Sequence, residues 1–174
     1  FNLVNFSDGA NGITLSLGIF WLLIFIIFGS INRDFLIFLL LSITLILLFN
    51  LKEKIFLGNN GSNLISIVFA VLFIINYNLD YSLKCDEIFL LMFLPAIDSL
   101  RVTLARIIKN KSPFDPDKNH FHHLLIDKFD KNIVFLPYTA LSVIPFALSI
   151  YLNTIIVFIS SLIGYFVIYL LIKR

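Results

Sequence analysis

Long apolar runs alternate with short polar stretches along this chain of 174 residues. A helix that crosses a bilayer needs about 20 predominantly apolar residues, so the long runs predict membrane spans. We expect the fourth span to continue as a helix to about residue 110. The predicted fold is an all-α, polytopic membrane helical bundle with about six transmembrane helices, at residues 13–29, 35–51, 63–78, 88–97, 133–152 and 154–172.

The composition supports a membrane protein. Hydrophobic residues make up 59% of the chain, 20 residues are Phe, and the mean hydropathy is +0.97. A soluble domain of this size has too little interior to bury that much apolar surface. The net charge of +2 does not favour a nucleic-acid partner. Cys85 stands alone, which excludes a disulfide framework and a cysteine-based metal site.

The basic residues are divided unequally between two sets of loops. One set of loops holds only Arg33 and Lys84. By the positive-inside rule the other set, here called the first set, therefore faces the cytoplasm. The first set comprises residues 1–12, 52–62, 101–132 and the C-terminus, and it holds eleven of the thirteen Lys and Arg residues: Lys52, Lys54, Arg101, Arg106, Lys109, Lys111, Lys118, Lys128, Lys131, Lys173 and Arg174. The polar motifs in these loops should therefore lie on one side of the membrane.

The chain reads as one membrane domain over residues 1–174. It begins at Phe1 inside a polar stretch, and no signal-peptide pattern precedes the first apolar run. We therefore expect it to be the C-terminal part of a longer protein.

Residues 95–123 form the longest polar passage and contain His120, His122 and His123. Zinc binding, proton relay and anion binding are all open to such a cluster. The neighbouring basic residues favour anion binding, because imidazole, Lys and Arg donate hydrogen bonds to phosphate oxygens. Zinc has weak support, since neither a cysteine nor an HExxH pattern accompanies the histidines. A basic loop that only sets membrane topology is the simpler alternative.

Two further polar features suggest chemistry. Asp98 and Arg101 are three residues apart, on nearly the same face of a helix, either as a structural pair or to position the arginine for a phosphate. Asp8 and the segment at residues 58–62 are rich in the oxygen ligands that suit magnesium. Only one carboxylate is present there, so a complete magnesium site would need others.

These residues together resemble the polyprenyl-phosphate N-acetylhexosamine-1-phosphate transferases of glycosyltransferase family 4. The resemblance is closer to the undecaprenyl-phosphate GlcNAc-1-phosphate branch than to the phospho-MurNAc-pentapeptide transferases. Residues 56–62 are similar to the family's F-x-G-D-x-G-S motif. Asn2, Asn5 and residues 8–12 are similar to its N-x-x-N-x-x-D-G-x-D-G motif. The family's histidine-motif loop is matched by Asp98, Arg101, Arg106, Lys111, Asp117, His120, His122 and His123.

The resemblance implies an activity and a setting. The family transfers a HexNAc-1-phosphate group from a UDP-sugar to polyprenyl (undecaprenyl) phosphate, which gives a lipid-diphosphate sugar and UMP in cell-envelope polysaccharide biosynthesis. The expected cofactor is Mg²⁺, with Mn²⁺ as the alternative. The expected location is the bacterial inner membrane, with UDP-N-acetylhexosamine, polyprenyl phosphate and the lipid bilayer as partners, no nucleic acid, and a homodimer left open.

The resemblance also implies roles for individual residues. Asp8 and Asn59 are expected at the metal. Asp8, His120, His122 and His123 are the expected catalytic residues. Substrate binding is expected from Asn2, Asn5, Asp98, Arg101, Arg106, Lys111 and Asp117.

Two departures keep other functions open. Asn11 and Asn59 stand where the family has Asp, so each lacks a charge that would attract a dication. The family's acidic pair on an earlier span is also missing from this chain, so we expect the chain by itself to be inactive. One alternative is a catalytically impaired homologue that serves as a binding or assembly protein. An unrelated transporter is disfavoured, because no charge other than Asp98, near a span end, lies within a predicted span.

Overall fold

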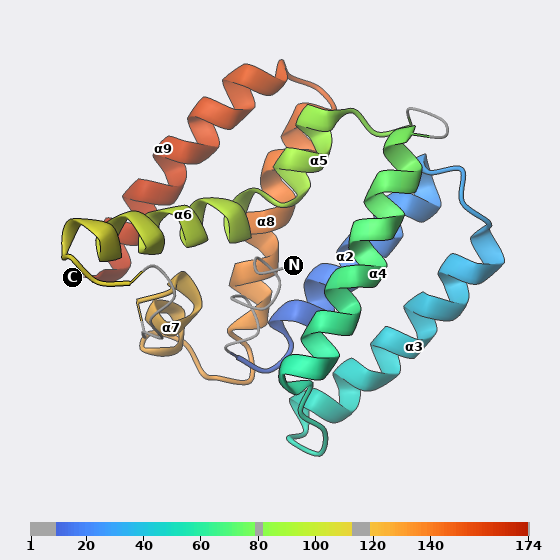
Figure 1. The fold of residues 1–174 in the computed structure, drawn as a ribbon, viewed down its shortest axis with the longest axis horizontal. Helices are drawn as coiled ribbons and strands as arrows, with labels where there is room; N and C mark the ends of the chain where they lie inside the picture. The colour runs from blue at the N-terminus through green and yellow to red at the C-terminus, as the bar shows by residue number, and fades with distance from the viewer. Residues whose placement is uncertain (1–9, 79–81, 113–118, 174) are drawn as a thin grey trace.

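The computed structural model describes residues 10–78, 82–112 and 119–173 (Figure 1). All regular elements in these residues are helices, as the sequence predicts. They are α2 (Ile13–Phe28), α3 (Arg33–Leu51), α4 (Gly58–Asn78), α5 (Cys85–Leu91), α6 (Phe93–Ile108), α7 (Phe121–Ile126), α8 (Phe135–Ser149) and α9 (Thr154–Lys173).

Helix α2 is the centre of the packing. It lies between α3 and α8 and behind α4 in Figure 1, and it contacts all three. Trp21 of α2 meets the rings of Phe69 and Phe73 edge-on, with centroids 5.1 and 5.4 Å away. At Gly18 a Cβ atom would lie 2.9 Å from the Phe69 ring. Helices α2 and α4 therefore approach closely because residue 18 has no side chain.

The six predicted spans correspond to six helical segments, but only some are long enough to cross a membrane alone. Helices α3, α4 and α9 meet that requirement, and α5 with α6 forms a fourth candidate if the bent pair is one span. Helices α2 and α8 are apolar but have only 16 and 15 residues. The prediction of about six spans is thus confirmed in part, as three or four candidates among the described residues.

The outer helices expose most of their apolar side chains. Only 17% of the most apolar window of α3 and 11% of that of α9 is buried inside the protein. An exposed apolar surface this extensive is stable only against lipid or another protein.

The fourth predicted span is broken rather than straight. Helices α5 and α6 are bent by 72° at Met92. Pro95 lies in the first turn of α6 and has no N–H to donate to the carbonyl of Leu91. The indole Nε1 of Trp21 donates to that carbonyl instead, at 3.1 Å. The bend therefore follows from a proline whose lost hydrogen bond is replaced from α2. The expected continuation of this helix to about residue 110 is confirmed, since α6 ends at Ile108, but the break at Met92 was not predicted.

Residues 58–62, expected as part of a loop, form the first turn of α4. Ser62 Oγ donates to the carbonyl of Gly58 at 3.1 Å, which gives the hydroxyl of this buried side chain a partner within the helix. The loop between α3 and α4 is accordingly shorter than predicted.

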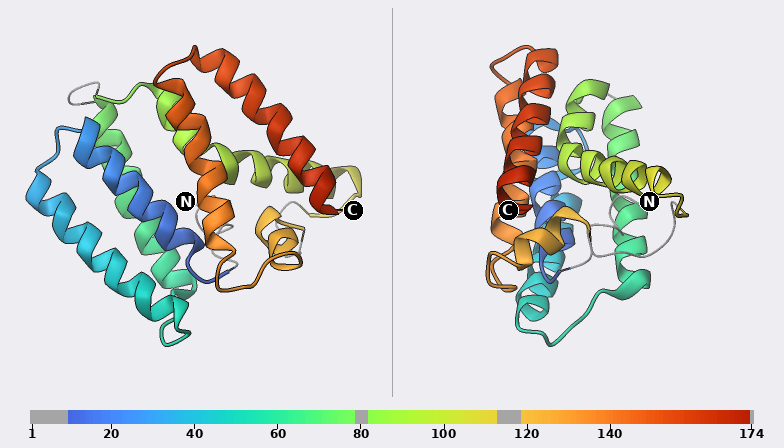
Figure 2. Two further views of the ribbon diagram at one scale, coloured as in Figure 1. Left: turned by 180° about the vertical axis from the view of Figure 1, so that it is seen from behind. Right: turned by 90° about the vertical axis from the view of Figure 1, so that its left-hand side faces the viewer.

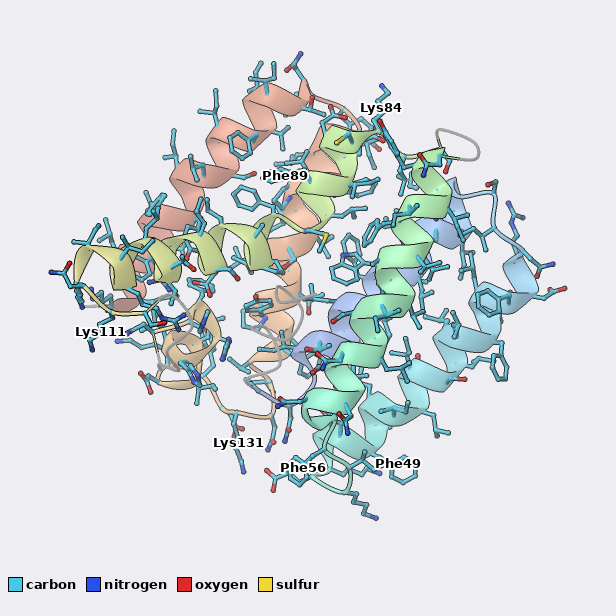
Figure 3. The ribbon with its side chains drawn as sticks, viewed as in Figure 1. Phe49, Phe56, Lys84, Phe89, Lys111 and Lys131 are labelled. Carbon is cyan, nitrogen blue, oxygen red and sulfur yellow. The ribbon has the colours of Figure 1, made fainter. Side chains whose placement is uncertain are left out.

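The two sets of loops lie at opposite ends of the bundle. Residues 10–12, the α3–α4 turn and α7 all lie in the lower half of the molecule in Figure 1, with the turn lowest, and the two views of Figure 2 agree. Figure 3 places Lys131 at this lower end and Lys84 at the upper end. The separation of basic loops inferred from the sequence is thus also a separation in the structure.

Candidate functional site

Asp98, on α6, is the anchor of the candidate site. Its side chain is buried, and each carboxylate oxygen accepts two hydrogen bonds. Oδ1 accepts from Arg101 Nη2 at 2.7 Å and from the Tyr165 hydroxyl at 2.9 Å. Oδ2 accepts from His120 Nδ1 at 3.0 Å and from the backbone N–H of Phe121 at 3.1 Å. These four donors fill the acceptor positions of a carboxylate, so Asp98 holds α6, α7 and α9 together.

The bond to Phe121 explains why the histidine helix begins where it does. Phe121 is the first residue of α7, and His120 precedes it with extended backbone. The first N–H groups of a helix have no partner within the helix. Asp98 therefore supplies, from another helix, the acceptor that a side-chain cap would normally provide.

Arg101 extends the same network. Its Nη2 donates to the carbonyl of Asn119 at 2.5 Å as well as to Asp98, and its Nε donates to the Tyr165 hydroxyl at 2.7 Å. Its guanidinium group also lies over the ring of Tyr169, 4.4 Å from the centroid. The guanidinium is thus held on several sides, with its charge beside the histidine helix.

The three histidines are adjacent but differ in environment. The rings of His120 and His122 are nearly parallel with centroids 5.7 Å apart, and those of His122 and His123 are 4.2 Å apart. His120 and His122 are buried, whereas His123 is half-buried. Burial, together with the neighbouring His123 and His120, lowers the pKa of His122 to about 3, so His122 is neutral near pH 7.

Both ring nitrogens of His122 are buried and find no hydrogen-bond partner among the described residues. Such a group is rare in folded proteins, because burying an unpaired polar atom is costly. The cluster therefore has unused hydrogen-bonding capacity at its centre.

The remaining predicted site residues of this passage lie further out. Arg106 is buried near the end of α6, and Lys111 is exposed beyond it (Figure 3). Asn2, Asn5, Asp8 and Asp117 lie outside the described residues. The structure thus gathers Asp98, Arg101 and His120 into one network, while direct substrate contact by any of these residues stays a prediction.

A second polar feature is a pocket of about 330 Å³, here called the amide pocket. Asn50 joins its walls, because its Oδ1 accepts from the backbone N–H of Gly12 at 2.7 Å and its Nδ2 donates to the carbonyl of Ile55 at 2.8 Å. The two asparagines that depart from the family motifs, Asn11 and Asn59, therefore face one pocket. Its lining residues are Ala10, Asn11, Asn50, Phe56, Leu57, Gly58 and Asn59.

The amide pocket does not fit a magnesium ion with the residues described. Its described lining contains amide oxygens and no carboxylate. The part of the chain that the structure describes also holds no group of three His, Cys, Asp or Glu residues placed to bind a metal. Mg²⁺ in proteins usually relies on one or two carboxylates. Asn59 alone is therefore a weak candidate ligand, and Asp8 would have to supply the charge.

The α3–α4 turn, whose residues line part of the amide pocket, and α7, which carries His122 and His123, both lie in the lower half of the molecule in Figure 1. An ion pair between Lys131 and Glu53 ties the segment after α7 to the α3–α4 turn. Ser16 and Thr139 hydroxyls, 2.6 Å apart, tie the start of α2 to α8. These contacts lie between the histidine side of the molecule and the side that carries Asn11 and Asn59.

Two residues of these sites were missed in the sequence. Tyr165 lies in an apolar span, and its signal was the repeat of Tyr165, Tyr169 and Lys173 at four-residue spacing along one helix face. Asn50 lies near the end of the apolar run at residues 35–51 and belongs to none of the motifs. Its burial shows that a lone amide at such a position can serve to hold a neighbouring motif.

The fold and the site define a helical protein with three or four candidate membrane spans among its described residues, in which Asp98, Arg101 and the histidines of α7 lie together. Residues 1–77 match the family described as "Glycosyl transferase family 4". The chain is 32% identical over 79 residues to the undecaprenyl-phosphate alpha-N-acetylglucosaminyl 1-phosphate transferase of Haemophilus influenzae, which covers 45% of this chain and 22% of that relative. The same enzyme of Pasteurella multocida is also 32% identical, with the same coverage.

A longer match reaches the histidine passage. The decaprenyl-phosphate N-acetylglucosaminephosphotransferase of Mycobacterium leprae is 28% identical over 176 residues, which cover 83% of this chain and 44% of that relative. The aligned parts thus span less than half the length of these relatives. No solved structure matches. These matches agree with the family predicted from the motifs: residues 1–77 match glycosyl transferase family 4, and the chain is distantly homologous to undecaprenyl- and decaprenyl-phosphate GlcNAc-1-phosphate transferases.

Proposed function

We propose that the full-length protein transfers a HexNAc-1-phosphate group from a UDP-sugar to polyprenyl phosphate, with UMP as the second product, in bacterial cell-envelope polysaccharide biosynthesis. One observation carries this proposal. His120 and the first residue of α7, Phe121, are bonded to Asp98 of α6, and Arg101 pairs with the same carboxylate. Such an arrangement suits a ligand with several phosphate oxygens.

The reaction needs charge neutralisation more than covalent chemistry. An oxygen of the lipid phosphate attacks the phosphorus next to the sugar, and the bond from that phosphorus to the bridging oxygen breaks, so that UMP leaves. In this proposal Arg101 and the imidazoles of His120, His122 and His123 bind phosphate oxygens and stabilise the charge that develops on them. Arg106 and Lys111 add positive potential along the same passage.

Mg²⁺, or Mn²⁺ in its place, would supply further neutralisation of the diphosphate when bound. We expect Asp8 and Asn59 near it. Asn2, Asn5 and Asp117 are expected to contribute to substrate binding. The amide character of Asn11 and Asn59 predicts a weak dependence on the metal at this position.

In this proposal the six helical segments cross or enter the inner membrane, with the histidine cluster and the amide pocket on the cytoplasmic side. The basic residues of these loops support that orientation. The exposed apolar faces of α3 and α9 would contact lipid acyl chains and the prenyl chain of the acceptor.

A catalytically impaired homologue is the second candidate, and a specific observation favours it. Asn11 and Asn59 line the same pocket, so both missing charges fall on one site rather than on two. Such a protein would bind substrate or partner subunits without turnover.

The test is release of UMP from UDP-GlcNAc and other UDP-HexNAc sugars by the full-length protein in liposomes that contain polyprenyl phosphate and Mg²⁺. We expect release by the wild type and its loss in His120→Gln. No release with any UDP-HexNAc would overturn the transferase. The variant Asn59→Asp then separates the two candidates, since a gain of activity from an inactive wild type identifies the impaired homologue.

A further inference from the structure

Tyr165 contacts both charged partners of the Asp98 network, although it lies on α9, more than sixty residues along the chain. Its hydroxyl oxygen is 2.9 Å from Asp98 Oδ1 and 2.7 Å from Arg101 Nε. Its side chain is buried, with 4% of its surface exposed. The hydroxyl therefore lies inside the network rather than at its edge.

The direction of these two hydrogen bonds is fixed by chemistry. An arginine nitrogen can only donate, so the Tyr165 oxygen accepts from Arg101 Nε. The phenol has one proton, and the carboxylate of Asp98 can only accept it. Tyr165 thus accepts a hydrogen bond from the guanidinium group and donates one to the carboxylate. These two bonds hold the side chains of Arg101 and Asp98 in one relative position.

The same chain reaches the histidine helix. Asp98 uses Oδ1 for Arg101 and Tyr165, which leaves Oδ2 for His120 Nδ1 and the Phe121 N–H. Because an ionised carboxylate only accepts, the proton of a neutral His120 must be on Nδ1. Nε2 is then the unprotonated nitrogen, which can accept a hydrogen bond. The orientation of Asp98 therefore sets both the tautomer and the angle of His120.

We propose that Tyr165 is a positioning residue for His120 and Arg101, and that α9 is a structural part of the active site although it lies outside the family's sequence motifs. This inference rests on the proposed transferase for its kinetic consequence. The loss of the hydroxyl leaves Asp98 with three donors, so its carboxylate can rotate and His120 with it. A small misplacement of a group at the reacting centre lowers the rate strongly.

Ring packing and hydrogen bonding by Tyr165 can be separated. The ring lies 5.4 Å from that of Phe121 and 6.4 Å from that of Tyr169, contacts that a phenylalanine preserves. Tyr165→Phe therefore removes only the hydroxyl. Tyr169→Phe is the matched control, because it makes the same change one turn away and keeps the ring beneath Arg101.

The experiment compares both variants as full-length protein in polyprenyl-phosphate liposomes. We expect Tyr165→Phe to lower kcat for UDP-GlcNAc about 10- to 100-fold with less than about twofold change in KM, because positioning matters most in the transition state. Tyr169→Phe should stay within about twofold of the wild type in both constants.

A second measurement keeps the inference independent of turnover. Histidine-specific ¹⁵N labelling in lipid reports the tautomer of His120, whose signals are assigned by their loss in His120→Gln. We expect Tyr165→Phe to shift the His120 ring signals and Tyr169→Phe to leave them in place. Unchanged His120 signals in Tyr165→Phe would overturn the positioning role. Shifted signals without UMP release by the wild type would support the positioning role and reject the transferase.

Discussion

The histidine cluster and the amide pocket lie in the same half of the molecule, but they differ in the charged side chains that they contain. The buried carboxylate of Asp98 accepts four hydrogen bonds, one of them from the neighbouring Arg101. In the amide pocket the described lining has asparagine where related motifs have acids. One region contains a buried ionic network, and the described lining of the other contains no charged side chain.

The difference indicates which region depends on ionic interactions. A buried ion pair is destabilising when one partner is removed, because the remaining charge has no compensation. An amide at a partly open position has no such dependence, and Asn59 is exposed. Substitutions in the two regions should therefore have very different effects on stability and binding.

The largest effect is expected from Asp98→Ala. It leaves the charge of Arg101 without its partner and the first N–H of α7 without its acceptor, so it should lower the free energy of unfolding by about 3–5 kcal/mol. Urea unfolding in detergent measures this. The exposed Asp127→Ala, next to α7, is the control and should change it by less than about 0.5 kcal/mol. Equal effects of the two variants would show that Asp98 is not an anchor.

The next largest effect is a loss of stability in acid that depends on His122. Its pKa falls from 6.5 in the unfolded chain to about 3 in the folded protein, so the unfolded chain binds more protons between these values. The contribution is fully present above pH 6.5, and about 2 kcal/mol of it is lost at pH 5. The variant His122→Gln should lose less stability than the wild type between pH 7 and pH 5. Parallel stability curves for both proteins would contradict the buried neutral imidazole.

A smaller effect is expected from Asn50 in the amide pocket. Asn50→Ala leaves the buried N–H of Gly12 without an acceptor, which should cost about 1–2 kcal/mol. Asn50→Asp keeps an acceptor for Gly12 and should recover part of that loss. Thermal unfolding followed by circular dichroism compares the three proteins. An alanine variant as stable as the wild type would show that Asn50 does not hold the two motifs together.

The smallest effect on stability is expected from Asn59→Asp, which should change the free energy of unfolding by less than about 0.5 kcal/mol because the side chain is exposed. Metal binding should respond more. The double variant Asn11→Asp, Asn59→Asp places two charges at one pocket and should raise the affinity for Mn²⁺ about tenfold or more, as measured by electron paramagnetic resonance. An unchanged affinity would mean that these positions do not approach the metal.

The helices could be predicted from the sequence because apolar runs of this length are typical of membrane-spanning helices. The positions of Asp98 and Arg101 on one helix face also followed from their spacing alone. The break at Met92 did not, although Pro95 was visible, because the compensating donor comes from Trp21 on a distant helix. Local patterns identify a proline's missing hydrogen bond but not the partner that replaces it.

The candidate site divides in the same way. The spacing of Asp98 and Arg101 predicted a shared helix face, and the ion pair between them agrees with that prediction. The contact of His120 with Asp98 was not predicted, and the roles of these residues toward a substrate stay predictions. Tyr165 and Asn50 could not be found from motifs, since each acts through packing between helices far apart in sequence. The shared pocket of Asn11 and Asn59 also required the tertiary structure, because 48 positions separate them along the chain.

The most direct test of the contrast between the regions is the affinity of the full-length protein for UMP, measured by calorimetry in lipid nanodiscs. We expect His120→Gln to weaken binding about tenfold or more, since a charge-assisted hydrogen bond contributes about 1.5–3 kcal/mol. Asn59→Ala should stay within about twofold of the wild type. The opposite ranking, with Asn59→Ala impaired and His120→Gln unaffected, would contradict the assignment of phosphate binding to the histidine cluster.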